Sequence, residues 1–162
     1  MLLHISFKGN LAGKLIPRTV AGSELGISTP YPEPTTPRVC FGPTVLKCFQ
    51  AIYPNVSDFF EIKNYPYMDF YVYKTKTNNP PGYVPNSKIV EEHWVHDAHV
   101  TGESWVIEPV IVYLYQKVRI HNTNNVDSLR YHPFGDPKEP LRTLAPKTAI
   151  IDYLPLSGSA KW

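Results

Sequence analysis

The sequence has few of the features that mark secreted, membrane-spanning or duplex-binding proteins. Its two cysteines, Cys40 and Cys48, are too few for a disulfide framework. A net charge of +2 and the lack of any long Lys/Arg block leave no electrostatic footprint for a long nucleic acid. The start, MLLHISFKGN, lacks the basic and long apolar regions of a secretory signal, and no later run could span a membrane. We therefore expect a soluble, cytoplasmic protein.

Apolar and loop-forming residues are both plentiful. Hydrophobic residues make up 43% of the 162 residues, which excludes wholesale disorder and suffices for the core of one domain. The 17 prolines and 9 glycines favour many loops and short strands over a helical bundle. We predict an α+β fold with a core in residues 1–124, and interpret residues 125–162 as an extension packed on that core.

Alternating apolar residues predict several short strands. In residues 2–7, Leu3 and Ile5 share one face and His4 lies on the other. Apolar residues at helical spacing predict a helix after Thr44, which ends at Pro54. Further strands are expected over residues 38–41, 58–62, 68–75, 101–107, 110–120 and 148–154, with loops over residues 8–37 and 77–87.

Three histidines, His93, His96 and His99, are spaced so that they could in principle bind zinc. Spacing of three suits a helix, but this segment leads into a predicted strand, where the same spacing sends successive side chains to opposite faces. No thiolate or glutamate has the spacing usual for a zinc partner. We interpret the three histidines as partly exposed loop residues and expect no metal.

Other single residues have a chemical and a structural interpretation. Cys40 and His4 could act as a nucleophile and its base if the environment tunes the thiol, or they could be an inert cysteine and a half-buried strand histidine. Glu103 follows a glycine at the head of an apolar strand. It is either a surface residue or a carboxylate placed to touch a sugar hydroxyl. Taken one at a time, the structural interpretations are favoured.

The order of three segments favours a nucleotide cleft. LLHISF, a strand with a central histidine, precedes the strand-to-helix unit RVCFGPTVLKC, and GESWVIE stands at the head of a late strand. This order resembles the ADP-ribosyltransferase fold family over about residues 2 to 120, and the last segment is also similar to small uncharacterised proteins of bacterial viruses. The resemblance implies a split antiparallel β-sheet core with few short helices, which encloses a cleft for NAD or an ADP-ribose-type nucleotide.

The resemblance also implies roles for individual residues. His4 matches the first-strand histidine that hydrogen-bonds a ribose hydroxyl. Glu103 matches the glutamate that stabilises the positive charge that develops on the sugar when the N-glycosidic bond breaks. Cys40 stands where the family often has a tyrosine, so Tyr53 or another aromatic residue would supply the stacking platform.

The remaining ligand contacts expected from the resemblance come from the same strands. Arg18 and Arg38 would hold the pyrophosphate, because a guanidinium offers a planar fork of donors to phosphate oxygens. Phe41, in the strand of Cys40, and the hydroxyl of Thr101 or Ser104 would add contacts, although strand register could send Ser104 to the face opposite Glu103.

Three functions are compatible with these residues. The first is an enzyme that cleaves NAD and passes ADP-ribose to an acceptor, which could be a protein. The second is a non-catalytic viral protein that sequesters an NAD-derived, cyclic ADP-ribose-like signalling nucleotide in the host cytoplasm and so opposes host defence, and Cys40 in place of tyrosine favours it. The third is a structural or interaction module, and for all three an oligomer is compatible with the sequence.

Overall fold

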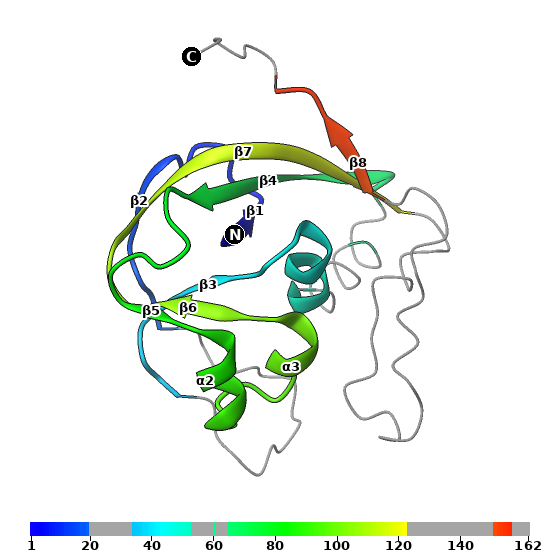
Figure 1. The fold of residues 1–162 in the computed structure, drawn as a ribbon. Helices are drawn as coiled ribbons and strands as arrows, with labels where there is room; N and C mark the ends of the chain where they lie inside the picture. The colour runs from blue at the N-terminus through cyan, green and yellow to red at the C-terminus, as the bar shows by residue number, and fades with distance from the viewer. Residues whose placement is uncertain (20–33, 53–59, 61–64, 123–150, 157–162) are drawn as a thin grey trace, which may run out of the picture.

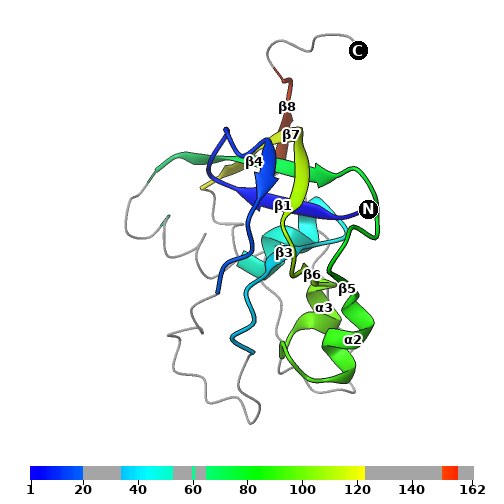
Figure 2. The same ribbon diagram turned by 90° about the vertical axis from the view of Figure 1, so that its left-hand side faces the viewer.

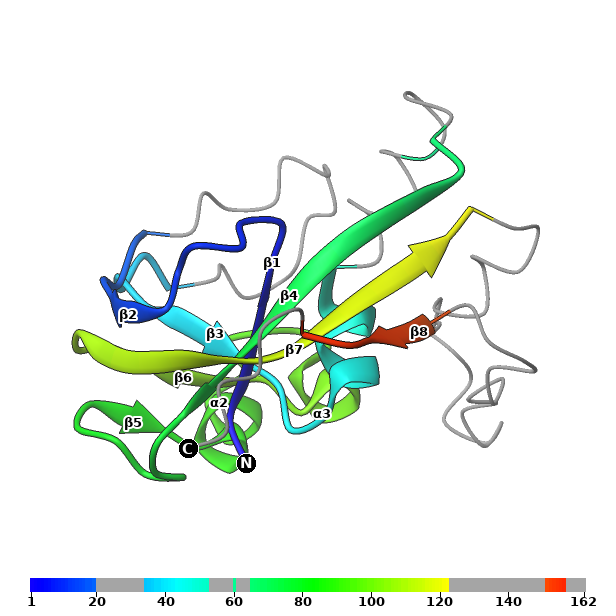
Figure 3. The same ribbon diagram turned by 90° about the horizontal axis from the view of Figure 1, so that it is seen from above.

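The computed structural model describes residues 1–19, 34–52, 60, 65–122 and 151–156. These residues form a mainly β structure with two antiparallel sheets and a few short helices. The larger sheet curls over the smaller one, so that its long strands arch across the top of the molecule (Figure 1). Seen from above, β4 and β7 run across the small sheet (Figure 3). The predicted antiparallel core with few short helices is therefore confirmed.

The large sheet has the strand order β1-β4-β7-β2, and β8 pairs with β7. Its longest pair, β4 with β7, contains a bulge where Val72 is opposite Gln116 and Tyr73 is opposite Leu114, which leaves Tyr115 as the extra residue. A bulge increases the local twist of a strand pair, and this one lies at the middle of the arch. The strands are β1 (Leu3–Ser6), β2 (Gly13–Leu15), β4 (Tyr67–Thr75), β7 (Val110–His121) and β8 (Ile151–Leu154).

The small sheet has the strand order β3-β6-β5 and carries helices on its outer side. Its strands are β3 (Val39–Phe41), β5 (Tyr83–Val84) and β6 (Ser104–Val106). Figure 2 shows the helices α2 (Asn86–Glu91) and α3 (Ala98–Thr101) on the side away from the large sheet. The two sheets are joined where Leu3 and Gly42 exchange backbone hydrogen bonds of 2.9 and 2.8 Å.

Three clusters of buried apolar side chains pack against these sheets. One buried cluster lies between the large sheet and the helical residues 45–52, and it includes Phe49 and Phe70, whose rings meet edge to face at 4.9 Å. A second cluster joins the large sheet to the small one through Phe41 and Tyr73. A third packs Trp105 beneath α2 and α3. The small sheet therefore has apolar side chains packed against both of its faces.

Several predicted elements are confirmed, and others need correction. The strands expected over residues 38–41, 68–75 and 110–120 are β3, β4 and β7 within a residue or two, and β8 lies within the predicted extension. Thr101 does not open a strand, because it is the last residue of α3 and Gly102 then ends that helix in the left-handed conformation. Of the strand expected over residues 58–62, only Phe60 lies among the described residues, and it is helical. The expected loops also contain β2 and β5, which pair with β7 and β6. Among the described residues no helix is long and apolar enough to cross a membrane.

We expect Tyr73→Phe to lower the free energy of unfolding by about 1–2 kcal/mol. The buried Tyr73 hydroxyl donates a 2.7 Å hydrogen bond to the carbonyl of Lys8 and accepts one of 3.2 Å from the amide of Leu11, so it fastens the chain that follows β1. Urea denaturation followed by circular dichroism measures the loss. Tyr113→Phe is the matched control, since Tyr113 is 41% exposed, and an equal loss in both variants would contradict this role.

Candidate functional site

The candidate residues from the sequence meet around Cys40. His4 lies on β1, and its Nδ1 is 3.0 Å from the carbonyl oxygen of Cys40 on β3. The ring of Phe41 lies 5.9 Å from the imidazole. Burial lowers the pKa of His4, and the hydrogen bond to Cys40 opposes this shift only in part. His4 is therefore neutral at physiological pH and helps to hold β1 against β3.

Glu103 immediately precedes β6 and lies near the same strand, β3. Its Oε1 accepts a 2.6 Å hydrogen bond from the indole nitrogen of Trp105, the residue that pairs directly with Cys40. Burial first, and then the charge and hydrogen bonding of Glu103, raise the pKa of the Cys40 thiol, while Arg38 lowers it. Cys40 therefore lies between Glu103 and Arg38 and stays protonated. It has no character of an activated nucleophile.

Arg38 is committed to the interior of the protein. Only 3% of it is exposed, and its guanidinium carbon lies 4.2 Å from the ring centre of Trp105. One guanidinium nitrogen donates to the carbonyls of Pro34, at 2.8 Å, and Thr36, at 3.3 Å. Trp94 stacks on Trp105 with ring centres 5.4 Å apart. The guanidinium thus contacts Trp105 and holds the chain that leads into β3.

The other predicted ligand contacts are dispersed. Arg18 is exposed, and its backbone forms an antiparallel bridge with that of Arg38. Thr101 is 1% exposed, and its hydroxyl donates to the carbonyl of Asp97 at 3.2 Å within α3. Tyr53 lies outside the described residues. Among the predicted residues, the structure brings together His4, Cys40, Arg38 and Glu103, along with Phe41.

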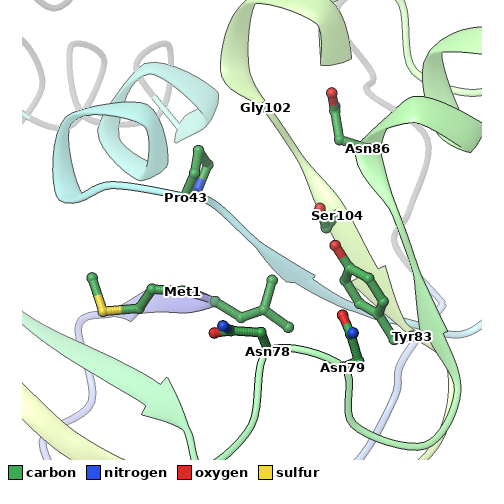
Figure 4. Close-up of a pocket in the computed structure, with 9 residues that line it drawn as sticks. Met1, Pro43, Asn78, Asn79, Tyr83, Asn86, Gly102 and Ser104 are labelled. Atoms are coloured by element: carbon green, nitrogen blue, oxygen red, sulfur yellow. The ribbon is translucent and has the colours of Figure 1, made fainter.

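A pocket of about 330 Å³ opens between the two sheets at the start of β1 (Figure 4). Most of its lining comes from Leu2, Asn78, Asn79, Tyr83, Asn86 and Ser104. Met1, Pro43 and Gly102 complete it. The polar side-chain groups of this lining are amides and hydroxyls, and none of the 9 residues has a charged side chain, while Met1 also carries the α-amino group of the chain.

Glu103 and Ser104 point to opposite faces of the small sheet. Successive side chains of a strand alternate between faces. Ser104 lines the pocket, whereas Glu103 bonds Trp105, which packs beneath α2 and α3. The side-chain amide of Asn86 links the two regions, because it donates to the carbonyls of Glu103, at 2.9 Å, and Ala98, at 2.8 Å. The carboxylate is therefore next to the pocket in sequence but is not part of its lining.

The three histidines do not form a metal centre in the described part of the chain. His93 and His96 precede α3, while His99 lies within it, and all three are exposed. The described residues contain no group of three or more metal-ligating side chains close enough to hold an ion.

Sequence reasoning missed most of the pocket. Asn78, Asn79, Tyr83 and Asn86 all lie in the segment TNNPPGYVPNS, which was predicted only as a loop. Loops that join regular elements often carry binding residues, and three asparagines around a tyrosine are a usable signal. No family model matches the chain, and the searches of curated proteins and of solved structures found no match either.

Because the pKa of its thiol is raised, we expect Cys40 to resist alkylation in the folded protein at about pH 8. Burial also raises the pKa of Cys48, to about 12, so both thiols should react only after denaturation. Peptide mass mapping after iodoacetamide treatment, with and without urea, measures both sites separately. Modification of Cys40 at the rate of a free cysteine in the native protein would contradict this description.

Proposed function

We propose that this protein binds NAD or an ADP-ribose-type nucleotide in the pocket between its two sheets, and holds it without cleaving it. The observation that carries the proposal is the pocket itself, which places amides and hydroxyls in a concave site between two sheets. Such groups hydrogen-bond ribose hydroxyls and the edges of bases. The segment order that resembles the ADP-ribosyltransferase fold points to the same class of ligand.

The placement of Glu103 supports binding without catalysis. A carboxylate stabilises the transition state of N-glycosidic cleavage only if it faces the sugar. Glu103 instead accepts a hydrogen bond from Trp105 on the far face of the small sheet. His4 is likewise engaged with the carbonyl of Cys40. A protein that sequesters an NAD-derived signalling nucleotide needs a pocket of this kind but no catalytic carboxylate in it.

Isothermal titration calorimetry with NAD, ADP-ribose and cyclic ADP-ribose tests this function. We expect saturable binding of at least one of the three and no release of nicotinamide from NAD by chromatography. Tyr83→Ala should weaken binding at least about tenfold, because it removes a ring and a hydroxyl from the pocket. Tyr153→Ala is the matched control, since Tyr153 is 63% exposed and lies on β8.

Two outcomes would overturn the proposal. If none of the three nucleotides gives a saturable heat of binding, the proposed class of ligand is wrong. Release of nicotinamide that is lost in Glu103→Gln would instead establish the enzymatic alternative, with Glu103 facing the substrate after all.

A further inference from the structure

We infer that the pocket holds the uncharged nucleoside part of its ligand and leaves the phosphates outside. This inference rests on the proposed function and specifies which part of the nucleotide the site recognises. Three features carry it: the size of the pocket, the lack of charged side chains in its lining, and the engagement of Arg38, a predicted phosphate ligand, elsewhere in the structure.

The size of the pocket suits one nucleoside. Ligand pockets for small molecules span about 300 to 1,000 Å³. At about 330 Å³, this pocket is at the low end of that range. NAD and ADP-ribose join two sugar-containing halves through a pyrophosphate, so only one half can enter.

The polar groups of the lining suit a neutral partner. The Asn86 side chain already donates both of its N–H groups to the carbonyls of Ala98 and Glu103, so it offers a ligand only its carbonyl oxygen. In Figure 4 the hydroxyl of Tyr83 points toward Ser104, while the polar end of Asn86 lies farther along the lining and points away from both. An acceptor and two hydroxyls match ribose hydroxyls or an amino group of a base. The lining has no Lys or Arg side chain to pair with a phosphate, and its one cationic group is the α-amino group of Met1.

The arginines predicted to bind pyrophosphate lie at the N-terminal end of β3, whereas the pocket is at its C-terminal end. The pocket is lined by Pro43, which follows β3, whereas Arg38 precedes that strand. Five residues of nearly extended chain put the Cα atoms of Arg38 and Pro43 roughly 16 Å apart, and the Arg38 side chain is directed to Trp105 and not to the pocket lining. The Arg38 guanidinium is also buried against Trp105 and bonded to backbone carbonyls. Arg18, which bridges Arg38, is at the same distant end.

Calorimetric titrations with adenosine, nicotinamide riboside and ADP-ribose, each at low and high salt, test the inference. We expect the better nucleoside to bind within about threefold of ADP-ribose, with less than about a twofold change between 50 and 500 mM NaCl. The inference is wrong if ADP-ribose binds but both nucleosides bind more than about tenfold more weakly than it does. It is also wrong if the higher salt concentration lowers the affinity for ADP-ribose by that factor, because phosphate recognition then dominates. If no ligand binds, the proposed function itself fails.

Pocket variants give a second readout. Ser104→Ala and Tyr83→Phe each remove one hydroxyl from the lining. Each substitution should lower the affinity for the nucleoside and for ADP-ribose by the same factor, about three- to tenfold, because both ligands would place the same nucleoside against that hydroxyl. Tyr113→Phe, on an exposed part of β7, is the control and should change neither affinity. A loss confined to ADP-ribose would contradict the inference.

Discussion

Trp105→Ala is expected to lower the free energy of unfolding by about 3–5 kcal/mol, the largest loss we predict for a single substitution. Trp105 is 1% exposed and, among the residues that the structure describes, is the largest fully buried side chain. Its ring is stacked between Trp94, at 5.4 Å, and the Arg38 guanidinium, at 4.2 Å, and its indole nitrogen donates to Glu103. Alanine would remove all three contacts and leave a cavity beneath α2 and α3.

A graded series separates packing from hydrogen bonding at this position. Trp105→Phe keeps an aromatic ring between Trp94 and Arg38 but loses the donor to Glu103, so it should cost less than alanine. Tyr153→Ala, at a 63% exposed side chain, should change stability by no more than about 0.5 kcal/mol. Urea denaturation measures all three variants. A loss below about 1 kcal/mol for Trp105→Ala would contradict the packing described for the small sheet.

Gly102→Ala is expected to lower the free energy of unfolding by about 2–4 kcal/mol, the sum of backbone strain and overlap. Gly102 ends α3 in the left-handed region, with φ of 68°. A Cβ at this position would lie 2.9 Å from Cγ and 3.1 Å from Cδ of the Pro43 ring. The same residue lines the pocket, so the substitution should also weaken nucleotide binding.

A double-mutant cycle with Pro43→Ala isolates the overlap from the strain. In the Pro43→Ala background the ring atoms that meet the new Cβ are gone, so Gly102→Ala should cost only about 1–2 kcal/mol. Urea denaturation of the single and double variants gives the coupling. If Gly102→Ala lowers the free energy of unfolding equally in both backgrounds, overlap with the Pro43 ring does not contribute to its cost.

The long strands could be predicted from the sequence because their burial repeats every two residues. In β4, Met68, Phe70 and Val72 alternate with Asp69 and Tyr71, and the first three are all buried in one core cluster. In β1 the predicted split is observed, with Leu3 and Ile5 in the cluster beneath the helical residues and Leu2 in the cluster between the sheets. The apolar face of each of these strands packs into a core cluster, and neighbouring strands pair with its edges. The local pattern and the fold therefore agree.

The short strands and the pocket could not be predicted, for a different reason. β5 contains only Tyr83 and Val84, too few residues for any alternation, and it is a strand only because it pairs with β6. The pocket joins Leu2 to Asn78 and Ser104, which lie far apart in the sequence. Such a site depends on how the two sheets meet. The sequence did identify the cluster of His4, Cys40 and Glu103, but local patterns did not show which face Glu103 occupies.

The central claim is that a nucleotide of the ADP-ribose type occupies the pocket between the sheets, and mapping of backbone amide shifts by NMR during an ADP-ribose titration tests it most directly. We predict saturable shifts that centre on Asn79, Tyr83, Asn86, Gly102 and Ser104, with Ile111 and Tyr153 unaffected. Saturable shifts centred on Arg18 and Arg38, or no shifts at millimolar nucleotide, would contradict the account.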